Sequence, residues 1–210
     1  MNQKWKSKPY WIIADDLSYN AYSNISKQIQ SRGTYTHTEI VPLDLDYSNT
    51  KIENNMCIEY KHTILSSDNV QEPDNLGYCL SCEDYAEIEI ITVLPKGYKI
   101  KTLLNNKSYH FDLLNVIRHE IEHVFQSKSF KIDNILHKRC KRSKRNFLLK
   151  KCEITAYAHG FRISTRSRDH FLESIKEFIA LHGKNLKLSD KEIEKTISVW
   201  YDYITKLKYH

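Results

Sequence analysis

The stretch FDLLNVIRHEIEHVFQ, residues 111–126, decides how this chain is expected to fold. Its apolar residues recur every three or four positions, which is the period of a helix with one buried face. The apolar residues on that face are Leu113, Leu114, Ile117, Ile121, Val124 and Phe125. His119 and His123 fall on the opposite side, with Asp112 and Gln126. The stretch therefore predicts a helix that is anchored on one face and presents two histidines on the other.

His119 and His123 enclose Glu120 in an HExxH sequence. Residues four apart lie one turn apart on the same helix face, so that both imidazoles can reach one zinc ion. The glutamate between them is placed to accept a proton from water that the metal has made more acidic. The alternative is two histidines on a solvated helix face. The anchored helix favours Zn²⁺, with His119 and His123 as ligands and Glu120 as the general base.

A third ligand is expected, because catalytic zinc usually has three protein ligands and an open position. Glu153 begins the stretch EITAYA, residues 153–158, which predicts a second helix with a carboxylate in its first turn. Ala156 and Gly160 share the face of Glu153 and are small, which favours the close approach of two helices. Tyr157 lies one turn further on, where its hydroxyl could donate a hydrogen bond to an oxyanion.

Two other residues compete with Glu153 for the role of third ligand. Asp133 and His137 are closer to His123 in the sequence. A carboxylate at the start of a helix can also serve only to offset the helix dipole. We expect Glu153 to be the ligand, and the alternatives stay open.

These residues carry a resemblance to a known family. An HExxH helix followed by a glutamate that opens a later helix resembles the gluzincin branch of the zincin metallopeptidases. The stretches HEIEHVFQ and EITAYA also resemble small predicted zinc peptidases of bacteriophage genomes. The resemblance covers about residues 85–162, and the gap between His123 and Glu153 is longer than in thermolysin-like enzymes.

The resemblance implies a zincin-like fold and the hydrolysis of peptide bonds. It implies zinc binding by His119, His123 and Glu153, and general-base catalysis by Glu120. It also implies that a strand at the edge of a sheet, before the active helix, pairs with the substrate backbone. Residues 85–94 are expected to be that strand.

The first half of the chain carries the signals of strands. Residues 85–94 read YAEIEIITVL and alternate apolar with acidic side chains, which predicts a strand with one buried face. Shorter strands are expected at 10–14, 38–45 and 57–65, a polar helix at 18–30 and a loop at 66–77.

Helices are expected in the second half. One runs from residue 153 to 183 with a break near 164–168, and a last helix begins at Ser189, which with Glu192 forms a capping box. This order predicts an α+β fold with a small mixed sheet, an active-site helix and C-terminal helices. We expect one domain over residues 1–210, rich in strands in 1–110 and helical in 111–210.

Composition limits the function classes. A formal net charge of +6 allows an acidic partner without requiring one. Five cysteines at irregular spacing make a poor disulfide framework, and no apolar stretch approaches the length of a membrane span. We therefore expect a cytoplasmic protein with no membrane partner, or a virion-associated one if the chain is of phage origin.

Two further signals are weaker. The run HKRCKRSKRNFLLKK, residues 137–151, carries eight Lys or Arg and no acid, so Lys138–Lys151 could attract an acidic partner or nucleic acid, or be a solvated loop. Cys79 and Cys82 form a CxxC pair, for which ordinary loop thiols are favoured over a metal or redox site.

The sequence thus predicts a zinc metallopeptidase acting on a peptide or protein substrate. The metal ligands are His119, His123 and Glu153, and the catalytic residues are Glu120 and Tyr157. The alternatives are a basic nucleic-acid-associated protein, or a zincin-fold structural protein without turnover.

Overall fold

The computed structural model describes residues 10–29, 35–47, 50–81, 85–129, 148–165 and 167–205. The chain divides into two compact units, Met1–Phe130 and Lys131–His210. Helices and strands are both present among the described residues, so the α+β class predicted from the sequence is confirmed. One domain over residues 1–210 stays a prediction.

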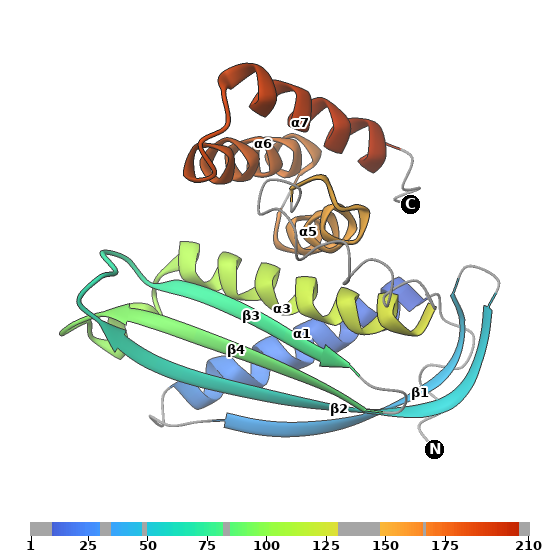
Figure 1. Cartoon of the computed structure of the whole chain (residues 1–210). Coiled ribbons are helices and arrows are strands. Elements are labelled where there is room, and N and C mark those ends of the chain that lie inside the picture. Colours follow the sequence, from blue (N-terminus) through green and yellow to red (C-terminus); the bar gives the residue numbers. More distant parts are fainter. Residues whose placement is uncertain are drawn as a thin grey trace. The chain divides into compact units, whose positions relative to one another are not determined.

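The described residues of the first unit form a four-stranded sheet and three helices (Figure 1). Its elements are α1 (Tyr10–Gln28), β1 (Tyr35–Tyr47), β2 (Thr50–Ser67), β3 (Asp74–Ser81), β4 (Tyr85–Pro95), α2 (Ile100–Leu103) and α3 (Lys107–Ser129). The strand order is β1-β2-β4-β3, with β2 and β4 parallel and the other two pairs antiparallel. The small mixed sheet expected from the sequence is therefore present.

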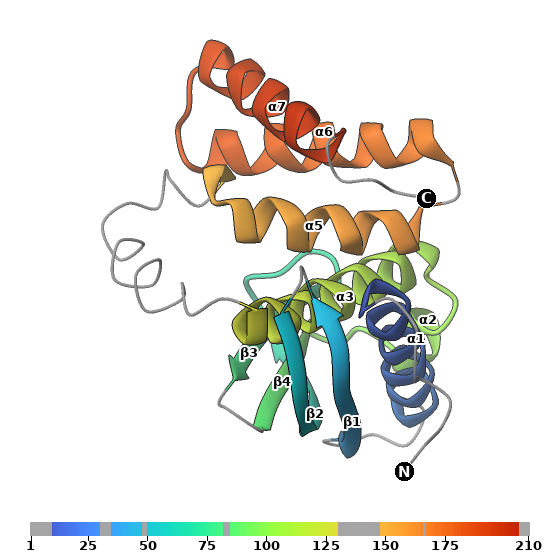
Figure 2. The same ribbon diagram turned by 90° about the vertical axis from the view of Figure 1, so that its right-hand side faces the viewer.

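Two long helices cover one face of this sheet (Figure 2). α3 packs against β3 and β4, and α1 packs against α3 and β1. The core between sheet and helices is apolar because β4 alternates as predicted, with Ala86, Ile88 and Ile90 buried. The predicted apolar face of α3 is confirmed for Leu113, Ile117, Ile121, Val124 and Phe125, which are buried, whereas Leu114 is only partly buried.

The interpretation of residues 10–14 as a strand and 18–30 as a polar helix was wrong. One helix, α1, runs through both segments. Its buried residues Ile13, Leu17, Ala21 and Ile25 are spaced four apart, which is a helical period. The apolar run at residues 11–13 is the first turn of that helix and not a buried strand.

The strands expected at 38–45 and 57–65 are present and longer, as β1 and β2. The loop expected at 66–77 was partly wrong, because β3 begins at Asp74. The start of β3 contains Asp, Asn and Gly, which are depleted in strands, so the sequence of this segment does not predict a strand.

The expectation that residues 85–94 form an edge strand was also wrong. β4 pairs with β2 on one side and with β3 on the other. In the described part of the sheet the edge next to α3 is β3, which pairs with β4 alone. A side-chain pattern reports which face of a strand is buried, but not whether both of its edges are paired.

The second unit is helical. Its helices are α5 (Lys151–Ser164), α6 (Arg168–Asn185) and α7 (Asp190–Ile204), and the break predicted near 164–168 falls between the first two. The capping box of Ser189 and Glu192 at the start of α7 is confirmed. Trp200 on α7 is fully buried and donates its indole N–H to the backbone carbonyl of Leu148. Among the described residues, no helix combines the length and the apolar character needed to cross a bilayer.

Candidate metal centre

The helix that carries the HExxH motif is fixed at its start and along its buried side. Asn106 caps α3, because its Oδ1 accepts the backbone N–H of Tyr109 at 3.2 Å. Arg118, next to the motif, is completely buried and donates to Asp15 on α1 at 2.9 Å and to Glu122 at 2.8 Å. Burial alone would lower the pKa of Arg118, but the charges of Glu122 and Asp15 outweigh it and raise that pKa. The motif helix is thus joined to α1 by a buried ion network.

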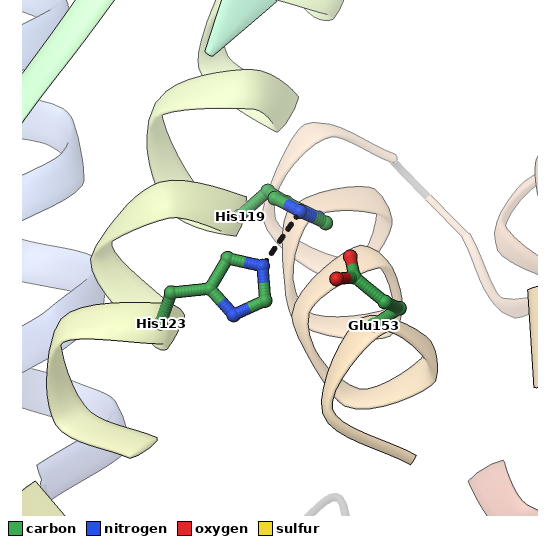
Figure 3. A group of neighbouring side chains, drawn as sticks. All are labelled: His119, His123 and Glu153. Atoms are coloured by element: carbon green, nitrogen blue, oxygen red, sulfur yellow. Dashed lines mark hydrogen bonds between the residues drawn. The ribbon is translucent and has the colours of Figure 1, made fainter. Parts of the chain in front are cut away.

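The two motif histidines face each other (Figure 3). Their Nε2 atoms lie 3.0 Å apart, and their rings are nearly perpendicular at 85°. Two nitrogen ligands of a tetrahedral zinc ion, each about 2.0–2.1 Å from it, are roughly 3.3 Å apart. The pair His119 and His123 therefore fits a shared zinc ion closely, and the prediction that one helix face brings the two rings together is confirmed.

A neighbouring amide sets the proton position on one of these rings. Nδ1 of His123 lies 3.0 Å from Oε1 of Gln126, which is buried. Because an amide oxygen only accepts, Nδ1 carries the proton and the lone pair of Nε2 is directed at His119. A partner of this kind orients a histidine ligand and increases its basicity. The sequence placed Gln126 on this side of the helix but did not assign it the role.

Glu120 lies beside the histidine pair. Its Oε1 is 3.9 Å from Nε2 of His119, and the residue is only 7% exposed. The carboxylate also lies over β3, because a Cβ built on Gly77 would be 2.6 Å from Cγ and Oε1 of Glu120. The side chain expected to act as general base is thus placed between the edge strand and the histidine nitrogens.

A chain of buried hydrogen bonds joins the sheet to α3 and was not predicted. Thr92 on β4 donates to Oδ1 of Asn75 on β3 at 2.8 Å, and Nδ2 of Asn75 donates to Asp112 at 2.9 Å. Nε2 of His62 lies 2.9 Å from Thr92 and must donate to it, since the only hydroxyl proton of Thr92 goes to Asn75. The chain holds the start of β3 against α3, two turns before His119.

Burial shifts the ionisation of two members of this chain. It raises the pKa of Asp112 to about 6, against the opposing effect of the hydrogen bond from Asn75. It lowers the pKa of His62 to about 4. His62 is therefore neutral near pH 7, while Asp112 is close enough to its pKa to change charge under mildly acidic conditions.

Two of the predicted site residues lie on α5, in the second unit. Glu153 is half-buried in the first turn of that helix and is the carboxylate drawn in Figure 3. The ring of Tyr157 packs against Phe178, with ring centroids 4.2 Å apart, and against Trp200 at 6.0 Å. The helix expected to begin near Glu153 is confirmed, and the roles of Glu153 and Tyr157 stay predictions.

Several other predicted features fall outside the described residues. They are Asp133, His137, Cys82 and the basic run except for residues 148–151. Cys79 is described, and it was wrongly placed in a loop because it lies on β3 and packs against the core.

Comparison of the chain with models of protein families, with curated proteins and with solved structures finds no match. The case for a function is therefore made by the motif and by the geometry around it.

Proposed function

We propose that this chain is a zinc-dependent hydrolase, specifically a metallopeptidase with a zincin-like fold. One observation carries the proposal. The Nε2 atoms of His119 and His123 are 3.0 Å apart, and Oε1 of Glu120 is 3.9 Å from the first of them. Two nitrogen donors and a carboxylate at this spacing suit a hydrolytic metal site, whereas two solvated histidines would have no reason to converge.

The proposed ligands are His119, His123 and Glu153. These three residues offer two imidazole nitrogens and one carboxylate oxygen, a donor set that can hold a metal ion. Two histidines with one glutamate is a combination found in catalytic zinc sites, which keep a fourth position open. Because α3 and α5 belong to different units, the participation of Glu153 is itself part of the proposal.

Zinc in this position would acidify a water molecule and polarise the carbonyl of a substrate. Glu120 would accept the proton of that water and deliver it to the amine that leaves. Its position supports this role, because its Oε1 lies 3.9 Å from Nε2 of His119 and the residue is buried beside the histidine pair. Tyr157 is proposed to donate its hydroxyl proton in a hydrogen bond to the oxyanion.

The proposed substrate is an extended peptide segment of a peptide or protein. β3 has an edge that no other described strand covers, and it lies alongside the helix that carries Glu120. An exposed edge can take up an extended peptide through backbone hydrogen bonds, which recognise a chain of almost any sequence. β3, and not β4, is therefore the proposed substrate-pairing strand.

Bound metal tests the proposal first. Protein purified without chelators or a histidine tag should contain about one zinc ion per chain by elemental analysis. His123→Ala should lose the metal. His170→Ala, which removes an exposed histidine on α6, is the matched control and should keep it. Zinc that is substoichiometric and indifferent to His123→Ala would overturn the metal site.

Activity tests the mechanism second. Glu120→Gln preserves the shape of the side chain but removes its basicity, so hydrolysis of an unstructured protein such as casein should be lost while zinc is kept. Full activity in Glu120→Gln would exclude general-base catalysis by this residue.

A further inference from the structure

β3 and α3 run side by side in the same direction (Figure 1). Asn75 on the strand is hydrogen-bonded to Asp112 on the helix, and a Cβ built on Gly77 would meet Val116 and Glu120. Two residues of strand advance about 6.7 Å and four residues of helix about 6 Å, so the steps match. The hydrogen bond to Asp112 thus sets a register that brings Gly77 to the level of Val116, one turn before Glu120.

Gly77 lies where a side chain has no space. A Cβ at this position would lie 2.6 Å from Cγ and Oε1 of Glu120 and 2.7 Å from Cγ1 of Val116. Distances below 3.0 Å are essentially never observed for a real Cβ, so a methyl group would have to displace one of these side chains. The methyl group would have to move the side chain of Val116, move the side chain of Glu120, or increase the distance between β3 and α3.

The backbone of Gly77 does not explain the glycine. Among the described glycines, only Gly97 has a positive φ, at 79°. Glycine in a strand is also unfavourable, because it loses more conformational entropy than other residues and has no side chain to pack. The contact with α3 is therefore the structural reason for glycine at position 77.

The contact involves the reactive atom of Glu120. The oxygen that would meet a Cβ of Gly77 is Oε1, the same oxygen that lies 3.9 Å from Nε2 of His119. A glycine needed only for apolar packing would adjoin hydrocarbon alone, as Gly183 does with Ile193.

We propose that Gly77 is a positioning residue, whose missing side chain lets the carboxylate of Glu120 lie against β3 and beside the histidine pair. Its meaning for catalysis rests on the proposed function. Its structural part, the coupling of position 77 to the length of the side chain at position 120, is independent of any activity.

A double-mutant cycle between Gly77→Ala and Glu120→Asp tests this coupling. Glu120→Asp removes one methylene and withdraws the carboxylate from β3. Gly77→Ala should lower Tm by about 5 °C in the parent protein, and by clearly less in the Glu120→Asp background. If Gly77 only packs against Val116, the Glu120→Asp substitution should not reduce the loss of Tm caused by Gly77→Ala.

A control substitution at another glycine, and a second parent variant, complete the double-mutant cycle. Gly183→Ala on α6 places a Cβ 2.7 Å from Ile193, which is a comparable clash without a carboxylate, and its effect on Tm should add to that of Glu120→Asp. If Gly77→Ala does not fold, Val116→Ala gives the methyl group room on one side. The same comparison is then made in the Val116→Ala background.

The outcomes separate the inference from the proposed function. Additive effects of Gly77→Ala and Glu120→Asp on Tm would overturn the inference whether or not the protein hydrolyses peptides. Lack of hydrolysis by the zinc-loaded parent, together with a coupled cycle, would overturn the peptidase and leave Gly77 as the positioning residue of Glu120. If the parent is active, Gly77→Ala should lower kcat at least tenfold with zinc retained and KM little changed, and an unchanged kcat would overturn the inference.

Discussion

Arg118 donates through Nη1 to Oε2 of Glu122, 2.8 Å away and one turn further along α3, and neither side chain is exposed. Glu122 is one of the two variable residues of the HExxH motif, and it points into the protein while His119 and His123 face each other. The motif helix is therefore fixed by charge on a different side from the one that carries the two histidines.

Removing one partner of this buried ion pair should lower the stability of the folded protein. Glu122→Ala is expected to lower the free energy of unfolding by about 3 kcal/mol, because it leaves the charge of Arg118 with Asp15 as its remaining carboxylate neighbour in the network. Urea denaturation measures the loss. Glu177→Ala, at an exposed position of α6, controls for the loss of a carboxylate and should change stability by less than about 0.5 kcal/mol. Equal effects of the two substitutions would contradict a structural role for the pair.

The hydrogen bond between His123 and Gln126 should affect metal affinity. Gln126→Ala is expected to weaken zinc binding about tenfold or more, because His123 loses the acceptor that orients its ring. Gln126→Glu keeps an acceptor oxygen and should bind zinc at least as tightly as the parent. Competition with a chromogenic chelator measures both affinities. If zinc affinity falls equally in the two variants, the hydrogen-bond acceptor at Nδ1 of His123 does not determine metal affinity.

The raised pKa of Asp112 predicts a dependence of stability on pH. The folded state holds the proton of Asp112 up to about pH 6, whereas the unfolded chain releases it near 3.9. The group therefore destabilises the fold as pH rises from about 4 to 6, by at most about 3 kcal/mol, and adds no cost below that window.

Asp112→Asn removes this titration and keeps an oxygen that can accept from Asn75. The variant should be more stable than the parent at pH 7, and its advantage should shrink toward pH 4. Unfolding free energies at the two pH values measure the difference. Asp68→Asn, at an exposed carboxylate, controls for the loss of one charge. If Asp112→Asn is more stable than the parent by the same amount at both pH values, the raised pKa of Asp112 is contradicted.

The helices of this chain could be predicted where their signals are local. The period of residues 111–126 and the capping box at Ser189 depend on neighbours in sequence, so α3 and α7 were found without a structure. α1 was misread because a short apolar run at its start is compatible with a strand. The spacing of four between Ile13, Leu17 and Ala21 was the signal that would have corrected it.

The part of the site contributed by β3 could not be predicted. Asn75 and Gly77 are unfavourable in an isolated strand, and their reasons for being there are the hydrogen bond to Asp112 and the contact with Glu120. Both contacts join residues that are far apart in the sequence. A periodic pattern within one segment carries no information about such a contact, and for the same reason the pattern of β4 does not reveal that both of its edges are paired.

The choice of third ligand predicts a ranking of metal contents. Glu153→Ala should lose most of its zinc, whereas Asp133→Ala and His137→Ala should keep it, because only Glu153 is proposed to complete the donor set of His119 and His123. Elemental analysis after dialysis against metal-free buffer compares the three variants. Retention of zinc by Glu153→Ala, with loss in one of the others, would transfer the role to that residue.

Tyr157 gives the last prediction, because its ring and its hydroxyl can be tested separately. The ring packs against Phe178 and Trp200, so Tyr157→Ala should destabilise the helical unit, whereas Tyr157→Phe keeps the ring and should leave Tm nearly unchanged. If the hydroxyl stabilises the oxyanion, Tyr157→Phe should lower kcat about a hundredfold with KM and zinc content preserved. Steady-state kinetics on the zinc-loaded variants decide between the two roles. A Tyr157→Phe variant with the kcat of the parent would restrict Tyr157 to packing and leave proton transfer by Glu120 as the chemistry proposed for this chain.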